Sequence, residues 1–263
     1  MQYIQIGNLK VSRFTIGGNP FSGFSHQGQD RDAEMHNYYT IELIKQELKK
    51  AEALGINTNL SRSDNFITQV QREYRNEGGN IQWFAQTASE LGLENAIQNA
   101  IDGKAKACYI HGGVIDNYYA NGQIDLIAPT IKKIKDAGMC AGIAGHRPEV
   151  FLWAEENIDC DFYMCCYYNP IYRGDDANHR HGLDEMFREE DRVKMFDIIK
   201  DLSKPVIHYK ILAAGRNDPE KAFQLAAKTM RPQDAVCVGI FSKDDPHMLE
   251  KDIKLFEKYT SLL

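Results

Sequence analysis

The chain has 263 residues, 43% of them hydrophobic, and its 31 basic and 37 acidic residues give a formal net charge of −6 at pH 7. This length suits one barrel domain or two smaller domains, and the apolar content can fill a large core. A mildly acidic chain without a long basic run is a poor binder of nucleic acid, because phosphate contacts need clustered Lys and Arg. We therefore expect a small-molecule substrate and no nucleic-acid partner.

Targeting signals and the use of cysteine indicate the cellular compartment of a protein. The opening residues, MQYIQ, have neither the basic nor the apolar region of a secretion signal, and no apolar run approaches the roughly 18 residues of a membrane span. Of the six cysteines, five lie in strand-like segments and no CxxC pair occurs, so we expect buried, reduced thiols and no structural zinc site. These features predict a cytoplasmic protein without a membrane partner. They do not decide whether the protein forms a homo-oligomer.

The first element expected is a β-hairpin over residues 2–13, QYIQIGNLKVSR, with Gly7-Asn8 as its turn. Such a hairpin could plug the bottom of a barrel. The strand that follows ends in Gly17-Gly18-Asn19-Pro20, and a loop of about twenty residues is expected after it. Loops of this length are usually functional when they are rich in aromatic residues, as this one is.

Eight short apolar strands are expected along the chain, and they alternate with helix-like segments such as 41–55, 124–138 and the one opened by Asp218-Pro219. Strands that alternate with helices form a parallel sheet, and eight such units predict an α/β fold, a (β/α)8 TIM barrel with an N-terminal β-hairpin, as one domain over 1–263. Active sites of this fold lie at the C-terminal ends of the strands. The strands are expected at 13–18, 56–61, 81–88, 107–113, 140–146, 161–169, 205–212 and 235–242.

Five local strings are distinctive: VSRFTIGG, ALGIN before the second strand, GIAGHRPEVF, YYNPIYR and VIHYKILAAGR. Together they resemble, over essentially the whole chain, the aldo-keto reductase family, whose members are NADP-dependent oxidoreductases. The resemblance implies a catalytic tetrad of Asp, Tyr, Lys and His, in which Tyr donates the proton and His orients the carbonyl. The matched positions hold Leu60 for Asp and Asn65 for Tyr, the third strand has no Lys, and only His111 remains.

The resemblance also implies a changed nicotinamide pocket. Ala144-Gly145 stand where the family has Ser-Asn, Cys165 stands for its Gln, and Tyr209 lies where a tyrosine stacks on the nicotinamide ring. The chain is therefore read as a divergent member of this superfamily that lacks most of the tetrad. Without the proton donor and its Lys partner, we expect chemistry other than carbonyl reduction.

Four residues are the catalytic candidates. His111 ends the fourth strand and can act as acid or base near neutral pH. Tyr209 and Lys210 lie on the seventh strand, where alternation allows only one of them to face inward before the strand ends. Lys210 could be a Schiff-base nucleophile or the partner of an acid at the rim. Asp64 follows the second strand and is the alternative proton carrier.

Further residues are expected to bind the substrate. Asn19, Asn59 and Asp64 cluster at the ends of the first two strands, where with His111 they could hold a sugar or a divalent metal. The other substrate-binding candidates are His146 at the end of the fifth strand, and Asn169 and Arg173 after the sixth. The segment His179-Arg180-His181 could close over an acidic substrate.

An anion site is expected in the loops after the last two strands, where barrels often bind phosphate. Its candidates are Arg216, Ser242 and Lys243. The leading interpretation is an enzyme that acts on a small polar, carbohydrate-like or phosphorylated substrate by non-redox acid–base chemistry of the lyase, isomerase or hydrolase type. One alternative is an NADP-dependent reductase with a substituted proton donor, Tyr209 or His111. The other is a non-catalytic ligand-binding barrel. The cofactor stays open, with NADP less favoured and a divalent metal not excluded.

Overall fold

The protein is described by a computed structural model over residues 1–178 and 180–261. Eight parallel strands close into a barrel, and each pairs with its neighbours in chain order until the last strand pairs with the first. The predicted (β/α)8 barrel is therefore confirmed, whereas the expectation of one domain over 1–263 stays a prediction. The barrel strands are β3 (Phe14–Gly17), β4 (Thr58–Arg62), β5 (Gln82–Gln86), β6 (Ala107–Ile110), β7 (Cys140–Gly145), β8 (Phe162–Cys166), β9 (Val206–Tyr209) and β10 (Ala235–Gly239).

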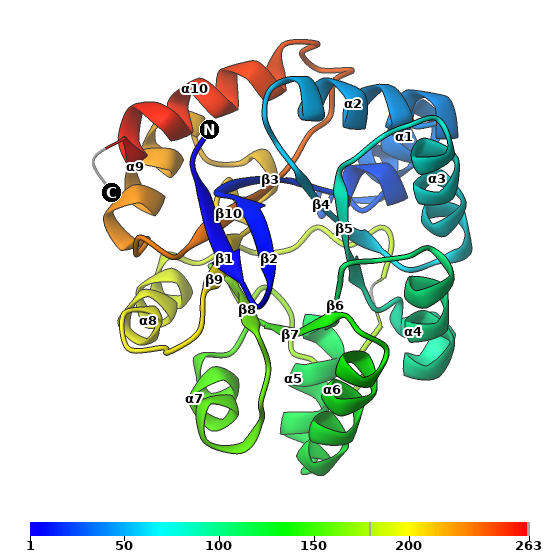
Figure 1. Ribbon diagram of the computed structural model, residues 1–263. Helices are drawn as coiled ribbons and strands as arrows, with labels where there is room; N and C mark the ends of the chain where they lie inside the picture. The colour runs from blue at the N-terminus through cyan, green and yellow to red at the C-terminus, as the bar shows by residue number, and fades with distance from the viewer. Residues whose placement is uncertain (179, 262–263) are drawn as a thin grey trace.

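Helices surround the barrel on its outer side (Figure 1). Several begin with a side-chain cap that the sequence makes plain, such as Asp218, whose carboxylate accepts from the N–H of Lys221. The helices are α1 (Gln29–Tyr38), α2 (Ile41–Ala53), α3 (Asn65–Asn76), α4 (Gly92–Asp102), α5 (Gly112–Ala120), α6 (Ile127–Asp136), α7 (Pro148–Asn157), α8 (Glu189–Ile199), α9 (Pro219–Thr229) and α10 (Met248–Thr260), with short 3-10 turns η1 (Pro20–Ser22), η2 (Ser89–Leu91), η3 (Ile124–Leu126) and η4 (Ala213–Gly215).

The predicted N-terminal hairpin is confirmed, and it covers one end of the barrel. Strands β1 (Tyr3–Ile6) and β2 (Leu9–Ser12) pair antiparallel, and Figure 1 shows them crossing the barrel end that faces the viewer. Ile4, Ile6 and Val11 pack into the same buried cluster as Phe84 and Phe162 of the barrel interior. The hairpin therefore closes the N-terminal end of the barrel with apolar side chains.

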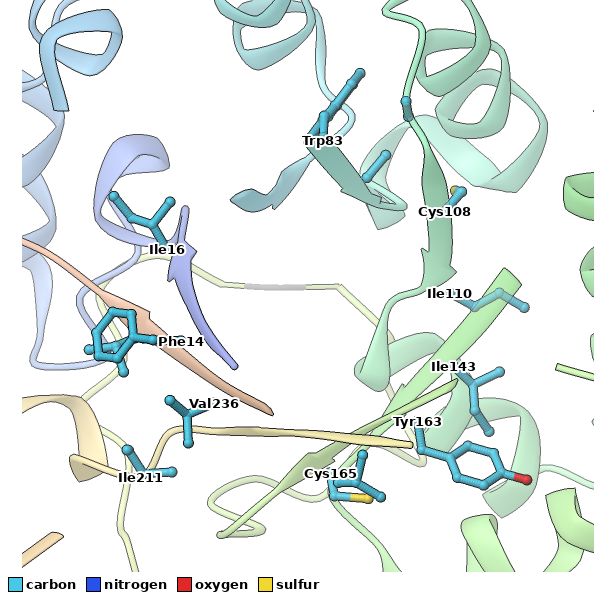
Figure 2. Packing of buried hydrophobic residues seen from close by; sticks show 14 of the residues in the cluster. Phe14, Ile16, Trp83, Cys108, Ile110, Ile143, Tyr163, Cys165, Ile211 and Val236 are labelled. Atoms are coloured by element: carbon cyan, nitrogen blue, oxygen red, sulfur yellow. The ribbon is translucent and has the colours of Figure 1, made fainter. Parts of the chain in front are cut away.

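Two buried layers follow from the alternation of side chains along each strand. Odd and even positions of one strand belong to different clusters: Ile207 of β9 lies inside the barrel, and Val206 packs outward. Figure 2 shows the outward layer, in which Ile110, Ile143 and Tyr163 of adjacent strands point away from the barrel centre. This alternation decides which strand-end residues can face the mouth.

Two helices were not expected from the sequence. The long loop after β3 contains η1 and α1, and α1 buries only Asp32 and Met35, so it carries little apolar periodicity. Helix α5 begins at Gly112, directly after β6, where the pair Gly112-Gly113 reads as a turn. Both helices lie at the C-terminal end of the barrel and contribute side chains to the candidate site.

Candidate functional site

A cavity of about 450 Å³ opens at the C-terminal ends of the strands and extends toward the loops that follow β9 and β10. Its inner end is lined by residues that end strands or follow them directly, and its outer end reaches α10. This is where active sites of the fold lie. The lining side chains used below are Asn19, His26, Arg31, Gln86, Tyr109, His111, His146, Tyr209, Lys210, Asp244, Met248 and Asp252.

Tyr209 and Lys210 both line the cavity, although they are consecutive. Tyr209 is the last residue of β9 and packs with the barrel interior, as its neighbour in alternation Ile207 does. Lys210 has a φ of 57°, so the backbone turns into the left-handed region immediately after the strand. That turn lets the lysine leave the strand alternation and join the tyrosine at the mouth.

A chain of hydrogen-bonding groups leads from a buried carboxylate to Tyr209. His146 Nδ1 lies 2.7 Å from Asp116 Oδ2, and both side chains are almost completely buried. The other ring nitrogen, Nε2, lies 3.4 Å from the hydroxyl oxygen of Tyr209. The order Asp116, His146, Tyr209 is a chain of hydrogen-bonding groups that ends at a phenol in the cavity, an arrangement along which a proton can move.

The protonation states along this path follow from burial and charge. Burial opposes the His146 imidazolium, but the Cys166 sulfur and the Asp116 carboxylate favour it, and together they raise the pKa of His146 to about 9. Burial raises the pKa of Tyr209 well above its ordinary value, and Cys166 and Asp116 add to this. At neutral pH, His146 is therefore charged and Tyr209 carries its proton.

His111 lies in the same cavity, between the end of β6 and α5. Its backbone N–H donates to Thr87 Oγ1 at 2.9 Å, which fixes its place beside the end of β5. Burial lowers the pKa of His111 well below its ordinary value, and the charges of Arg62 and Arg173 act in the same direction. His111 is therefore neutral at physiological pH and is suited to hydrogen bonding rather than to carrying charge.

Lys210 is held in a buried network with residues from two distant loops. Its Nζ lies 3.1 Å from Glu185 Oε2, and Glu185 Oε1 lies 3.0 Å from His26 Nδ1. Asn19 Nδ2 lies 3.1 Å from the other ring nitrogen of His26. Lys210 is thus the partner of an acid, one of the two roles expected for it, and its role as a Schiff-base nucleophile stays a prediction.

This network connects the segment before α8, which contains Glu185, to the loop after β3 and to the end of β9. Burial opposes ionisation of Glu185, but Lys210 and His26 hold the pKa of its carboxyl far below the usual range. Burial and the charge of Lys210 lower the pKa of His26 to about 4, so its ring is neutral. Around this network, the Gly28 N–H donates to the Leu183 carbonyl and the Gly182 N–H donates to Asp32 Oδ2.

Asp64 and Asn59, expected near the mouth, lie elsewhere. Asp64 accepts from the N–H of Ile67 as the N-cap of α3 and forms an ion pair with Arg62. Asn59 lies on the outward face of β4, where its amide donates to the Ile16 carbonyl and accepts from Gln71. Both contacts hold secondary structure in place, and neither residue lines the cavity in the described part of the chain.

Asn169 and Arg173 line a second, smaller cavity of about 300 Å³. His146 and Asp116 line it too, and His146 also lines the main cavity. Arg173 is buried and donates from Nη1 to the Asn178 carbonyl at 2.9 Å. The binding roles of Asn169, Arg173 and His146 stay predictions. Within the segment His179-Arg180-His181, His179 lies outside the described residues.

The three residues expected to bind an anion are held by other partners. Arg216 donates to Asp184 Oδ1 and to the His26 carbonyl. Lys243 lies 2.9 Å from Glu34, and Ser242 Oγ lies 3.1 Å from the Tyr38 hydroxyl. An anion would have to displace a carboxylate to reach either cation, and the site stays a prediction.

Several residues of the cavity were not expected from the sequence. Tyr109 donates to Gln86 Oε1 at 3.2 Å, and the Gln86 amide nitrogen is buried without a partner among the described residues. Alternation could have found Tyr109, because it lies two residues before His111 and therefore faces the same side of β6. No pattern marks Glu185, which lies in an irregular segment, or Asp116, which lies in an unexpected helix.

Other site classes find no support in residues 1–178 and 180–261. No group of three or more His, Cys, Asp or Glu in this part of the chain could hold a metal ion. All six cysteines are free thiols. Among the described residues, no helix has the length and apolar character needed to cross a membrane.

Comparisons with known proteins give structural relatives only. No protein-family model and no curated protein matches the chain. A Pseudomonas aeruginosa structure described as an aldo-keto reductase is 16% identical with a TM-score of 0.66, and the match covers 98% of this chain and 95% of that one. An aldo-keto reductase from Bacillus halodurans is 13% identical with a TM-score of 0.59, covering 98% and 91%. The chain has the fold of the aldo-keto reductases.

A third solved structure, described as a 2,5-diketo-D-gluconic acid reductase B, is 11% identical with a TM-score of 0.59 and is matched over 99% of this chain and 89% of that one. These likenesses agree with the family resemblance of the sequence at the level of the fold. They also correct one expectation: the reading as a non-redox lyase, isomerase or hydrolase is wrong, because these three neighbours are described as reductases.

Proposed function

We propose that the protein is a nicotinamide-dependent reductase of a small polar aldehyde or ketone, in which Tyr209 replaces the missing proton donor. The observation that carries this proposal is the path Asp116, His146, Tyr209, which ends in a cavity shared with His111. Neither Leu60 nor Asn65 can donate a proton to a carbonyl oxygen. A protonated phenol beside a charged imidazole can do so.

The shape and backbone of the cavity fit a nicotinamide dinucleotide. The cavity is continuous from Tyr209 along Leu212, Ala214 and Gly215 to the side chains of α10, and its volume lies within the roughly 300–1,000 Å³ of ligand pockets. Ala213, Ala214 and Gly215 all have positive φ, at 47°, 54° and 83°. Left-handed alanines are strained, and such backbone often forms concave anion sites at ligand clamps. Ala214 and Gly215 line the cavity at this turn and would face the diphosphate.

The bound nicotinamide would supply the hydride, and the chain's own residues would supply the proton. Tyr209 Oη gives its proton to the carbonyl oxygen as negative charge develops there. His146 Nε2–H restores that proton, and Asp116 holds the imidazole so that Nε2 faces the phenol. Neutral His111 donates a hydrogen bond that orients the carbonyl. The polar side chains Asn19, Gln86 and His26 around this end suit a hydroxylated substrate.

Turnover and binding must be measured separately to test this proposal. The purified protein would be assayed for oxidation of NADH and NADPH against a panel of hydroxylated aldehydes and ketones. We expect turnover that Tyr209→Phe lowers by roughly 100- to 10,000-fold while dinucleotide binding persists. Binding without turnover in the wild type would instead support a non-catalytic ligand-binding barrel. Equal turnover in the wild type and the Tyr209→Phe variant would contradict the assigned proton donor.

A further inference from the structure

The outer end of the main cavity contains a buried carboxylate that the proposed chemistry does not use. Asp252 lies on α10, one turn after Met248, and both side chains line the cavity. Asp252 is only 4% exposed, and its Oδ2 has no hydrogen-bond partner among the described residues. A buried, unpaired carboxylate is costly, so a protein that keeps one at a cavity wall has a polar group to receive there.

The charges around Asp252 exclude an anionic group of the ligand from this end of the cavity. Arg31 is the cation that lines this end in the described part of the chain, and it already pairs with Asp244 and Glu34. Its guanidinium also lies 4.5 Å from the centre of the Phe241 ring. Asp244 lines the same end as Asp252. A phosphate placed here would meet two carboxylates and an arginine that is already neutralised.

We propose that Asp252 accepts hydrogen bonds from hydroxyl or amino groups of the ligand's outer half, and that the site therefore selects NAD(H) over NADP(H). This inference rests on the proposed nicotinamide function. An acidic side chain that accepts from the ribose hydroxyls is the usual means by which proteins recognise a dinucleotide that has no 2′-phosphate. A 2′-phosphate would bring negative charge against Asp252 and Asp244.

Equilibrium binding of four probes tests this selection without requiring turnover: NADH, NADPH, ADP-ribose and 2′-phospho-ADP-ribose. We expect the two unphosphorylated probes to bind the wild type at least tenfold more tightly than their phosphorylated forms. Asp252→Ala should weaken NADH binding by roughly 10- to 100-fold, as expected for the loss of hydrogen bonds to a charged group. Asp252→Asn preserves the shape of the side chain and should reduce the difference in affinity between NADH and NADPH.

Glu257→Gln is the matched control, because Glu257 is an exposed carboxylate of the same helix and does not line the cavity. Equal or tighter binding of the phosphorylated probes to the wild type would overturn the inference, and so would an equal loss in the control. Selective ADP-ribose binding without hydride transfer would overturn the proposed reaction and leave the selection standing. If none of the four probes binds, both proposals fall.

Discussion

His146 Nδ1 lies 2.7 Å from Asp116 Oδ2, and His146 lines both the main cavity and the smaller one beside it. A charged imidazole carries a proton on both ring nitrogens, and its hydrogen bond to the buried carboxylate fixes the orientation of the ring. The opposite ring nitrogen is thereby directed at Tyr209. This relationship makes the pH dependence of the reaction a direct test of the path.

The first prediction concerns that pH dependence. The pKa of His146 is raised to about 9, so its charged form and the stabilisation it contributes persist at neutral pH and are lost as the pH rises through 9. Reductase activity should therefore fall above pH 9. In Asp116→Asn the same fall should occur at lower pH, because the favouring carboxylate is gone. A pH–rate profile of both proteins decides this, and superimposable profiles would contradict the path.

A second prediction separates chemistry from binding at His111. Because this neutral ring orients the carbonyl in the proposed reaction, His111→Asn should lower kcat/KM by roughly 100-fold or more. The dissociation constant for NADH should change little. Steady-state kinetics and a fluorescence titration on one preparation measure both quantities. A large loss of NADH affinity with unchanged kcat would assign His111 to the dinucleotide instead.

The third prediction concerns the buried Lys210–Glu185 pair, whose side chains are 7% and 3% exposed. Removing one partner of a buried pair leaves an uncompensated charge, so Glu185→Gln should cost about 3–5 kcal/mol and lower Tm by roughly 10 °C. The double variant Glu185→Gln with Lys210→Met should recover much of this loss. Thermal denaturation of wild type, single variants and double variant completes the cycle. Additive losses would show that the two residues act independently.

A fourth prediction follows from Asp252 in the absence of ligand. Burial raises the pKa of this carboxyl to about 7, with a contribution from Asp245, so the folded protein retains a proton there that the unfolded chain has lost. Stability should therefore decline between about pH 4 and pH 7 as the unfolded chain releases this proton. Asp252→Asn should stabilise the protein at pH 8 by up to about 4 kcal/mol and should do little at pH 4. Urea unfolding at both values measures the difference.

The barrel could be predicted because its eight strands are short apolar runs separated by helical segments with clear ends. The presence of Lys210 at the mouth could be predicted only conditionally, since it depends on the left-handed turn after Tyr209. The same alternation rule shows why Asn59 does not line the cavity: Leu60 belongs to the barrel interior, so its neighbour faces outward. Asp64 stands directly before a helix and is its N-cap, a role that its position already indicated.

The proton path itself could not be predicted. Asp116 lies in a helix whose opening glycine pair reads as a turn, and its contact with His146 joins residues 30 positions apart. The Glu185 network depends on long-range packing of irregular segments, to which periodicity does not apply. The missing tetrad residues also misled the expectation of chemistry, because the loss of one acid–base set does not exclude another set supplied by a different strand.

The hairpin at the N-terminal end has a kinetic consequence. The side chains of Ile4, Ile6 and Val11 close that end of the barrel. Ligands therefore enter and leave the cavity at the C-terminal end of the barrel. Two ligands that share one entrance cannot bind and dissociate independently. The ligand that lies deeper in the cavity binds first and dissociates last. Turnover in this protein should therefore follow a compulsory order, and the departure of the deeper occupant should set its pace.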